Sequence, residues 1–146
     1  MPTYTVKYSG IDLTSQQKYR IAQSITKAHY TETGANSFFA QVIFEESHNG
    51  NHFMGGKPVT EPQLFLHGQI RAGRTPDVKQ KLILGLRDAL VNDFGLGKSQ
   101  IWVYLVDLVP SQMIEYGEIL PPSGQESEWF SGLSPSLKEK LAAMEK

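Results

Sequence analysis

Two arginines stand three residues apart in the stretch HGQIRAGRTPD, at Arg71 and Arg74. They directly precede Thr75 and Pro76, residue types that are typical of the cap and first turn of a helix. Two guanidinium groups beside a helix N-terminus would form a small anion site, suited to a carboxylate held by forked donors. The alternative is that both arginines are solvated loop residues, since paired arginines near turns are common.

A second candidate is the proline that follows Met1 in MPTYTVKYSG. Removal of Met1 would leave Pro2 with a free secondary amine on a rigid ring, able to give or take a proton. With Met1 retained, the nitrogen of Pro2 is an amide, and the residue serves only as the entry to a strand. These residues alone leave both interpretations open.

The remaining polar candidates are ambiguous by themselves. Glu115 lies in QMIEYG and Tyr104 in IWVYL, and a tyrosine in an apolar strand is usually a core residue. His29 lies near the end of a predicted helix. His48 and His52 lie in a loop rich in Asn and Gly, without the spacing of a known ligand set. We therefore expect no metal ion and no other cofactor.

Composition limits the classes of function. A chain of 146 residues with 40% hydrophobic and 20% charged residues is typical of one globular domain. The formal net charge of -1 provides no broad basic surface for nucleic acid or anionic lipid. The chain has no cysteine, which excludes disulfides and thiolate metal sites. Its first twenty residues lack the apolar run of a signal peptide or membrane span. We expect a cytoplasmic protein that binds neither nucleic acid nor membranes.

The elements that must position these residues form two similar units. The alternation in residues 3–8 predicts a strand. The apolar spacing that follows predicts an amphipathic helix, capped by Thr14 and ended by Gly34. Residues 38–46 read as a second strand, and residues 47–58 read as a loop.

The second unit repeats this order, with a strand, a helix that Thr75 caps and Gly95 ends, and another strand. We predict an α/β fold of tandem strand–helix–strand units, with parallel pairing within each unit and two helices on one face of the sheet. The predicted strands cover residues 63–70 and 100–108. The whole chain, 1–146, is expected to form a single domain of two repeats, about 2–60 and 61–110, extended by a turn-rich C-terminal tail that ends in a short charged helix.

The initial MP and the segments KAHY, HGQIRAGR, IWVYL and MIEYGEILPPSGQESEWF together resemble the tautomerase superfamily, specifically its cis-3-chloroacrylic acid dehalogenase group. The likeness spans nearly the whole chain. It implies a homotrimer with the sheets lining its centre. By resemblance, the catalytic residues are Pro2, Glu115 and Tyr104, and the substrate-binding residues are His29, Arg71 and Arg74.

The resemblance also implies a reaction. Water would add to cis-3-haloacrylate or a related small unsaturated carboxylic acid, giving malonate semialdehyde. Glu115, oriented with Tyr104, would activate the water, and cationic Pro2 would donate a proton. One alternative is a keto–enol tautomerase of 2-keto acids that uses neutral Pro2 as a base. Another is a cytokine-like binding protein, because the superfamily includes signalling proteins of the macrophage migration inhibitory type.

Overall fold

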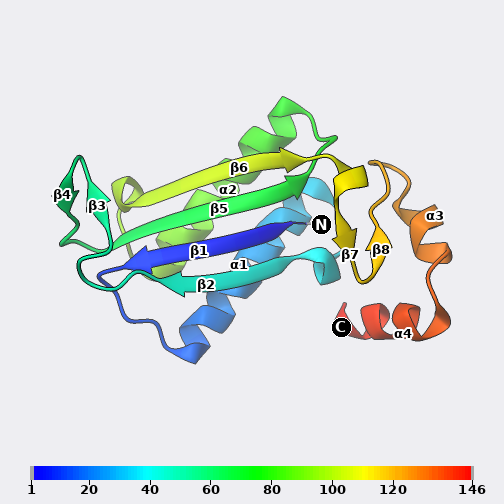
Figure 1. The fold of residues 1–146 in the computed structure, drawn as a ribbon, viewed down its shortest axis with the longest axis horizontal. Helices are drawn as coiled ribbons and strands as arrows, with labels where there is room; N and C mark the ends of the chain where they lie inside the picture. Colours follow the sequence, from blue (N-terminus) through cyan, green and yellow to red (C-terminus); the bar gives the residue numbers. More distant parts are fainter. Residues whose placement is uncertain (1, 146) are drawn as a thin grey trace.

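The computed structural model describes residues 2–145, and its centre is a four-stranded mixed sheet in the order β2-β1-β5-β6 (Figure 1). The strands are β1 (Thr3–Ser9), β2 (Gln41–Glu46), β5 (Gln63–Arg71) and β6 (Ile101–Leu108). β1 pairs with β2 and β5 pairs with β6 in parallel, and the two units join through the antiparallel pair β1 and β5. The predicted α/β fold of tandem strand–helix–strand units is confirmed.

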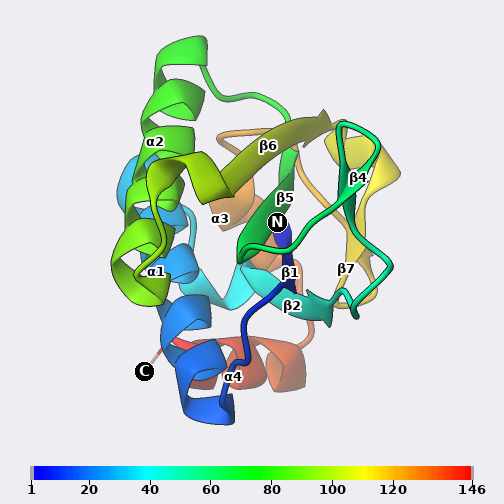
Figure 2. The same ribbon diagram turned by 90° about the vertical axis from the view of Figure 1, so that its left-hand side faces the viewer.

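Helices α1 (Ser15–Thr33) and α2 (Pro76–Phe94) make the two crossovers and lie on the same face of the sheet (Figure 2). Their ends are those that the sequence predicts. Thr14 caps α1 by accepting a hydrogen bond from the backbone N–H of Gln17, and Gly34 ends the helix at a positive φ of 69°. Thr75 and Gly95 have the same roles in α2.

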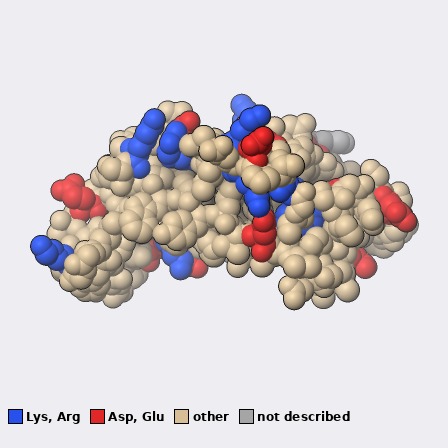
Figure 3. All heavy atoms as spheres, turned by 90° about the horizontal axis from the view of Figure 1, so that it is seen from above, with Lys and Arg blue, Asp and Glu red and all other residues tan. Residues whose placement is uncertain are grey.

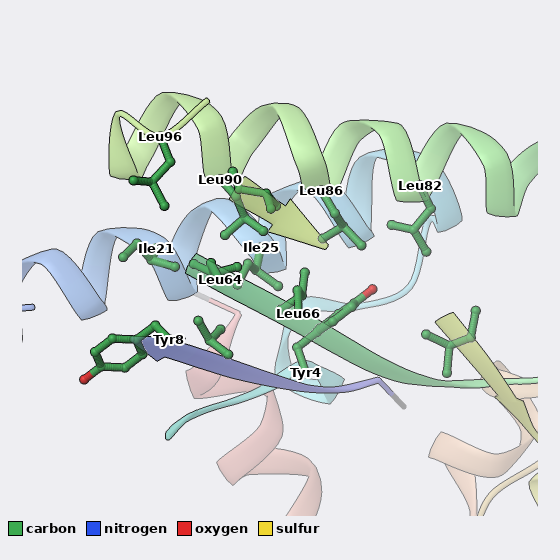
Figure 4. Close-up of a cluster of buried hydrophobic side chains, with 13 residues drawn as sticks. Tyr4, Tyr8, Ile21, Ile25, Leu64, Leu66, Leu82, Leu86, Leu90 and Leu96 are labelled. Carbon is green, nitrogen blue, oxygen red and sulfur yellow. The ribbon is translucent and has the colours of Figure 1, made fainter. Parts of the chain in front are cut away.

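The main core fills the space between these helices and the sheet (Figure 4). α1 contributes Ile21 and Ile25, spaced one turn apart, and α2 contributes a row at the same spacing. The sheet contributes the alternate side chains of its strands that face the helices. The most deeply buried members are Tyr4, Val6, Ile25, Leu64, Leu66, Ile70, Leu82, Leu86 and Leu90, each with 0% of its surface exposed.

The predicted strand over residues 38–46 is wrong at its start. Residues Ser37–Phe39 form a 3-10 helix, η1, and β2 begins only at Gln41. Phe38 and Phe39 are adjacent and both buried in a second apolar cluster. A strand would direct two consecutive side chains to opposite faces, so a helical turn is needed to bury both on one side.

The predicted loop over residues 47–58 contains a short hairpin, β3 (Phe53–Met54) and β4 (Lys57–Pro58). Its turn is made by Gly55 and Gly56, at φ values of 58° and 76°. Two-residue hairpin turns of type I′ need positive φ at both central positions, which glycine adopts without strain. The Gly-Gly pair was the signal for this hairpin.

The C-terminal tail folds back on its own chain beside the start of β1 (Figure 1). It contains a second hairpin and two helices: β7 (Ile114–Glu115), β8 (Glu118–Ile119), α3 (Glu126–Ser131) and α4 (Pro135–Met144). Short 3-10 turns precede β6 and β7, as η2 (Lys98–Gln100) and η3 (Pro110–Gln112). Leu120, Leu133 and Leu141 of the tail pack with Phe38 and Phe39 in the second cluster.

Charged side chains of both signs lie close together on the face in Figure 3, and much of that face carries neither. This distribution agrees with the formal net charge of -1. In the described part of the chain, no helix has both the length and the apolar character needed to cross a membrane.

Candidate active site

His29 lies in the last turns of α1, and a hydrogen bond to β1 fixes its ring. The Tyr4 hydroxyl lies 2.7 Å from His29 Nδ1, and both residues are buried. Gly68 on β5 makes room for the tyrosine ring. A Cβ atom at Gly68 would lie only 2.6 Å from Tyr4 Cε1 and 2.8 Å from a methyl group of Leu105. The absence of a side chain at residue 68 therefore helps to set the position of the histidine.

His29 is neutral in this setting. Burial, assisted by the positive charge of Arg74, lowers the pKa of His29 to about 3. Burial also raises the pKa of Tyr4, so its hydroxyl keeps the proton. When this hydroxyl donates its proton to Nδ1, the ring proton of neutral His29 lies on Nε2. His29 thus presents an N–H donor at Nε2.

Arg71 ends β5 with 1% of its side chain exposed, and the C-terminal tail surrounds its guanidinium group. Arg71 Nη1 donates to the carbonyl oxygens of Pro121 at 2.8 Å and Pro122 at 3.4 Å. Arg71 Nη2 donates to the carboxylate of Glu126. The sequence predicted that Arg71 binds an anion, but it did not show that Glu126 already pairs with it.

Arg74 is held by the same strand end. Its Nη1 donates to the carbonyl oxygen of Arg71 at 2.9 Å. Burial and the neighbouring Arg71 lower the pKa of Arg74. Arg74 lines a cavity of about 690 Å³, and Phe38, Phe130 and Glu126 are among the other lining residues. This guanidinium group therefore faces a space large enough for a small organic acid.

Three buried nitrogen atoms in residues 2–145 have no hydrogen-bond partner, and all three belong to predicted substrate-binding residues. They are His29 Nε2, Arg71 Nε and Arg74 Nε. Buried donors are normally satisfied, so each unmet donor calls for an explanation. The charge of Arg74 acts on His29, and the charge of Arg71 acts on Arg74, which indicates that the three groups lie near one another. An anion beside Arg74 would supply the missing acceptors.

Glu115 and Pro2 lie at the same end of the sheet. Glu115 on β7 lines a cavity of about 640 Å³ together with Thr3 and Gln41. Pro2 is buried, and its carbonyl oxygen accepts a hydrogen bond from Gln41 N–H at 3.0 Å. The cavity containing Glu115 and the cavity containing Arg74 share Phe38 and Phe39 in their walls. Met1 lies outside the described residues, so its predicted removal stays a prediction.

Tyr104 lies apart from this group within one protomer. On β6 it is paired with His67 and its ring contacts Phe65, on the face of the sheet away from the helices. Tyr4 lies on the opposite, helix-covered face. The Tyr104 side chain is 53% exposed. A role for Tyr104 in the same site would require the tyrosine of a second copy of the chain.

One of the two loop histidines, His52, connects the loop to the sheet. His52 Nδ1 lies 2.7 Å from the hydroxyl of Ser9, which links the β3–β4 hairpin to the end of β1. Within residues 2–145, no group of three or more His, Cys, Asp or Glu side chains is placed to hold a metal ion.

Sequence reasoning missed two residues of this site. Tyr4 was assigned only to a strand, although its alternation places it on the helix-covered face. Glu126 lies in the segment QESEWF, which contributed to the family resemblance but was given no individual role. Its contact with Arg71 joins residues 55 positions apart, so no local spacing could indicate it.

Comparison with known proteins agrees with this fold. Residues 1–132 match the family described as "Putative oxalocrotonate tautomerase enzyme". The crystal structure of N1, a member of the cis-3-chloroacrylic acid dehalogenase family, superposes with a TM-score of 0.92 and 30% identity, covering 97% of this chain and 99% of N1. No curated protein sequence gives a significant match.

Two more distant structures share the fold. Pt0534 inactivated by 2-oxo-3-pentynoate has a TM-score of 0.73 and 23% identity, covering 81% of this chain and 94% of that one. A fused 4-OT wild-type symmetric trimer has a TM-score of 0.73 and 21% identity, with the same coverage. The chain belongs to the tautomerase superfamily, and its likeness to N1 over nearly the full length places it in the cis-3-chloroacrylic acid dehalogenase group.

Proposed function

We propose that this protein adds water to cis-3-haloacrylate or a related small unsaturated carboxylic acid. The observation that carries the proposal is the set of unmet buried donors on His29, Arg71 and Arg74. In the proposed complex these donors bind the substrate carboxylate. They also stabilise the charge that collects there when a nucleophile attacks the β-carbon. Family membership supports the same arrangement.

The proposed reaction adds a hydroxyl group to the β-carbon of the double bond and a proton to the α-carbon. Glu115 takes a proton from water as the water oxygen bonds to the β-carbon. Pro2, freed by loss of Met1 and protonated, donates a proton to the α-carbon. The product is a 3-halo-3-hydroxy acid, which loses hydrogen halide to leave malonate semialdehyde. No redox step and no cofactor are needed for this balance.

The proposed assembly is a homotrimer. The sheet face away from the helices carries Ile43, Trp102, Tyr104 and Val106, each between 41% and 53% exposed. Its edge strands β2 and β6 have no further neighbours among residues 2–145. Association through this face would cover apolar surface and open edges. It would also bring Tyr104 of one subunit toward the site of another, where the proposed role of Tyr104 places it.

A keto–enol tautomerase is the second candidate, because the matched family is described as an oxalocrotonate tautomerase. It would use the same carboxylate donors, with neutral Pro2 as a base. A cytokine-like binding protein would leave the three buried donors without a purpose. We therefore keep the two enzyme functions and prefer the hydratase, in which Glu115 has a role.

The experiment compares two forms of the protein, one with Met1 removed and one with an added residue that keeps the nitrogen of Pro2 acylated. Both are verified by mass and incubated with cis-3-chloroacrylate, and chloride and malonate semialdehyde are measured. The Met1-free form should be faster by about 10²–10⁴-fold, the usual contribution of a general acid. Equal turnover in both forms would rule out the proline mechanism.

A further inference from the structure

The tail closes over one of the two arginines and leaves the other facing the cavity. Arg71 is covered by Pro121, Pro122 and Glu126, whereas Arg74 lines the cavity. The close approach of the tail depends on Gly73, between the arginines. A Cβ atom at Gly73 would lie 2.8 Å from the Cβ of Ser123. The tail therefore belongs to the wall of the proposed carboxylate site.

The charges around Arg74 can be counted from its neighbours. Arg71, Glu126 and Asp107 are the charged groups that act on it. Glu126 is paired with Arg71, and Asp107 is paired with Lys79, whose Nζ lies 2.7 Å from Asp107 Oδ2. Each pair cancels. Arg74 is then left as a single net positive charge at the cavity wall.

The other titratable groups of the site do not change this count, because the Pro2 cation and the Glu115 carboxylate of the proposed reaction have opposite charges. Tyr4 keeps its proton, and the ring of His29 is neutral. Glu126 is ionised: burial alone would raise its pKa, but the hydrogen bond from Arg71 outweighs burial and the pKa of Glu126 is lowered. Glu126 also lines the cavity beside Arg74, so its pairing with Arg71 takes place at the cavity wall.

We propose that Glu126 is a specificity-determining positioning residue that holds Arg71 and restricts the site to ligands with one carboxylate. The first carboxylate of a ligand meets Arg74, the donor of His29 and the Nε donor of Arg71, whose other two nitrogens are held by the tail. A second carboxylate would meet no uncompensated cation, because Glu126 already neutralises Arg71. The inference rests on the proposed carboxylate site, and it adds the charge class of the ligand and the residue that sets it.

The test measures binding without turnover. Propionate and malonate are saturated three-carbon acids that carry one and two charges at neutral pH, so they differ chiefly in charge. Their dissociation constants are measured by calorimetry on the wild type, E126Q, E126D and E128Q. Glu128 is the matched control, because it is a glutamate that lies exposed on the same helix. Thermal unfolding checks that each variant is folded.

E126Q keeps the size of the side chain and removes its charge, so the binding ratio should shift toward malonate by about tenfold or more. E126D and E128Q should keep the wild-type preference for propionate. A purely structural role of Glu126 would weaken both acids equally in E126Q, and an unchanged ratio would overturn the proposal.

The wild type gives a test that does not depend on any variant being folded. Tighter binding of malonate than of propionate by the wild type would also overturn the proposal. If the wild type binds neither acid, the carboxylate site itself is wrong and the inference falls with it. If the ratio shifts as expected but cis-3-chloroacrylate is not consumed, the inference holds and the proposed reaction is wrong.

Discussion

At the scale of single residues, the site depends on buried donors whose surroundings are made by residues far away in the sequence. His29 illustrates this. Its type and its place near a helix end were visible in the sequence, and the family resemblance assigned it to substrate binding. Its protonation state depends on burial and on Tyr4 and Arg74, which come from other elements. The residue types of the candidate site could be named from the sequence, whereas their burial and electrostatics could not.

Neutral His29 should make the protein less stable in acid. Its pKa falls from 6.5 in the unfolded chain to about 3 in the folded one. Between these values the unfolded chain binds the extra proton, so stability is lost as pH falls through this window. His29 alone should contribute a slope of about 1.4 kcal/mol per pH unit to the free energy of unfolding.

Urea unfolding of the wild type and of H29Q at several pH values inside this window measures that slope. Glu126, whose pKa is also lowered, contributes to the acid dependence of both proteins and cancels in the comparison. H29Q should show the shallower dependence. The same slope in both proteins would mean that His29 is protonated in the folded state.

At the scale of elements, the sequence was informative where a local signal decides the structure. The ends of α1 at Thr14 and Gly34, and of α2 at Thr75 and Gly95, are as predicted. A helix cap depends on residues next to it in the sequence. The strand start at residue 38 could not be predicted. Two adjacent phenylalanines favour a strand by propensity, and only the distant tail that packs on them makes a helical turn preferable.

Gly68 connects strand packing to the site, and its replacement should affect both. In G68A the new methyl group would collide with the ring of Tyr4, the residue that holds His29. We expect a loss of about 1–3 kcal/mol in the free energy of unfolding, typical of overpacking, together with weaker binding of propionate.

G85A is the control for this change. Gly85 lies inside α2, and a Cβ atom there would meet nothing within 4 Å. G85A should be neutral or stabilise the protein by up to about 1 kcal/mol, because alanine favours a helix over glycine. If G68A leaves stability and propionate binding as they are in the wild type, Gly68 does not control the position of His29 through Tyr4.

At the scale of the whole molecule, the exposed face of the sheet makes a specific prediction about assembly. W102E places a charge at the centre of the proposed subunit interface, where Trp102 is 46% exposed in one protomer. We expect light scattering to find a trimer for the wild type and smaller species for W102E. Turnover of W102E should also fall when assembly is lost, because Tyr104 would no longer reach a neighbouring site.

Y19E controls for the loss of an exposed aromatic residue, since Tyr19 lies on α1, away from this sheet face, and is 65% exposed. It should remain trimeric. A wild-type monomer at micromolar concentration, or a W102E variant that assembles like the wild type, would refute the proposed interface.

The central claim is that Glu115 activates water, and paired rates of E115Q test it most directly. Hydration needs this base, whereas enol tautomerisation needs only the amine of Pro2 and the anion site. With Met1-free protein, E115Q should consume cis-3-chloroacrylate about 10²–10⁴-fold more slowly than the wild type, the usual loss when a general base is removed. Ketonisation of the enol of phenylpyruvate by the same sample should change little. Equal losses in both rates would contradict the account, because Glu115 would then support the geometry of the site and not the attack of water.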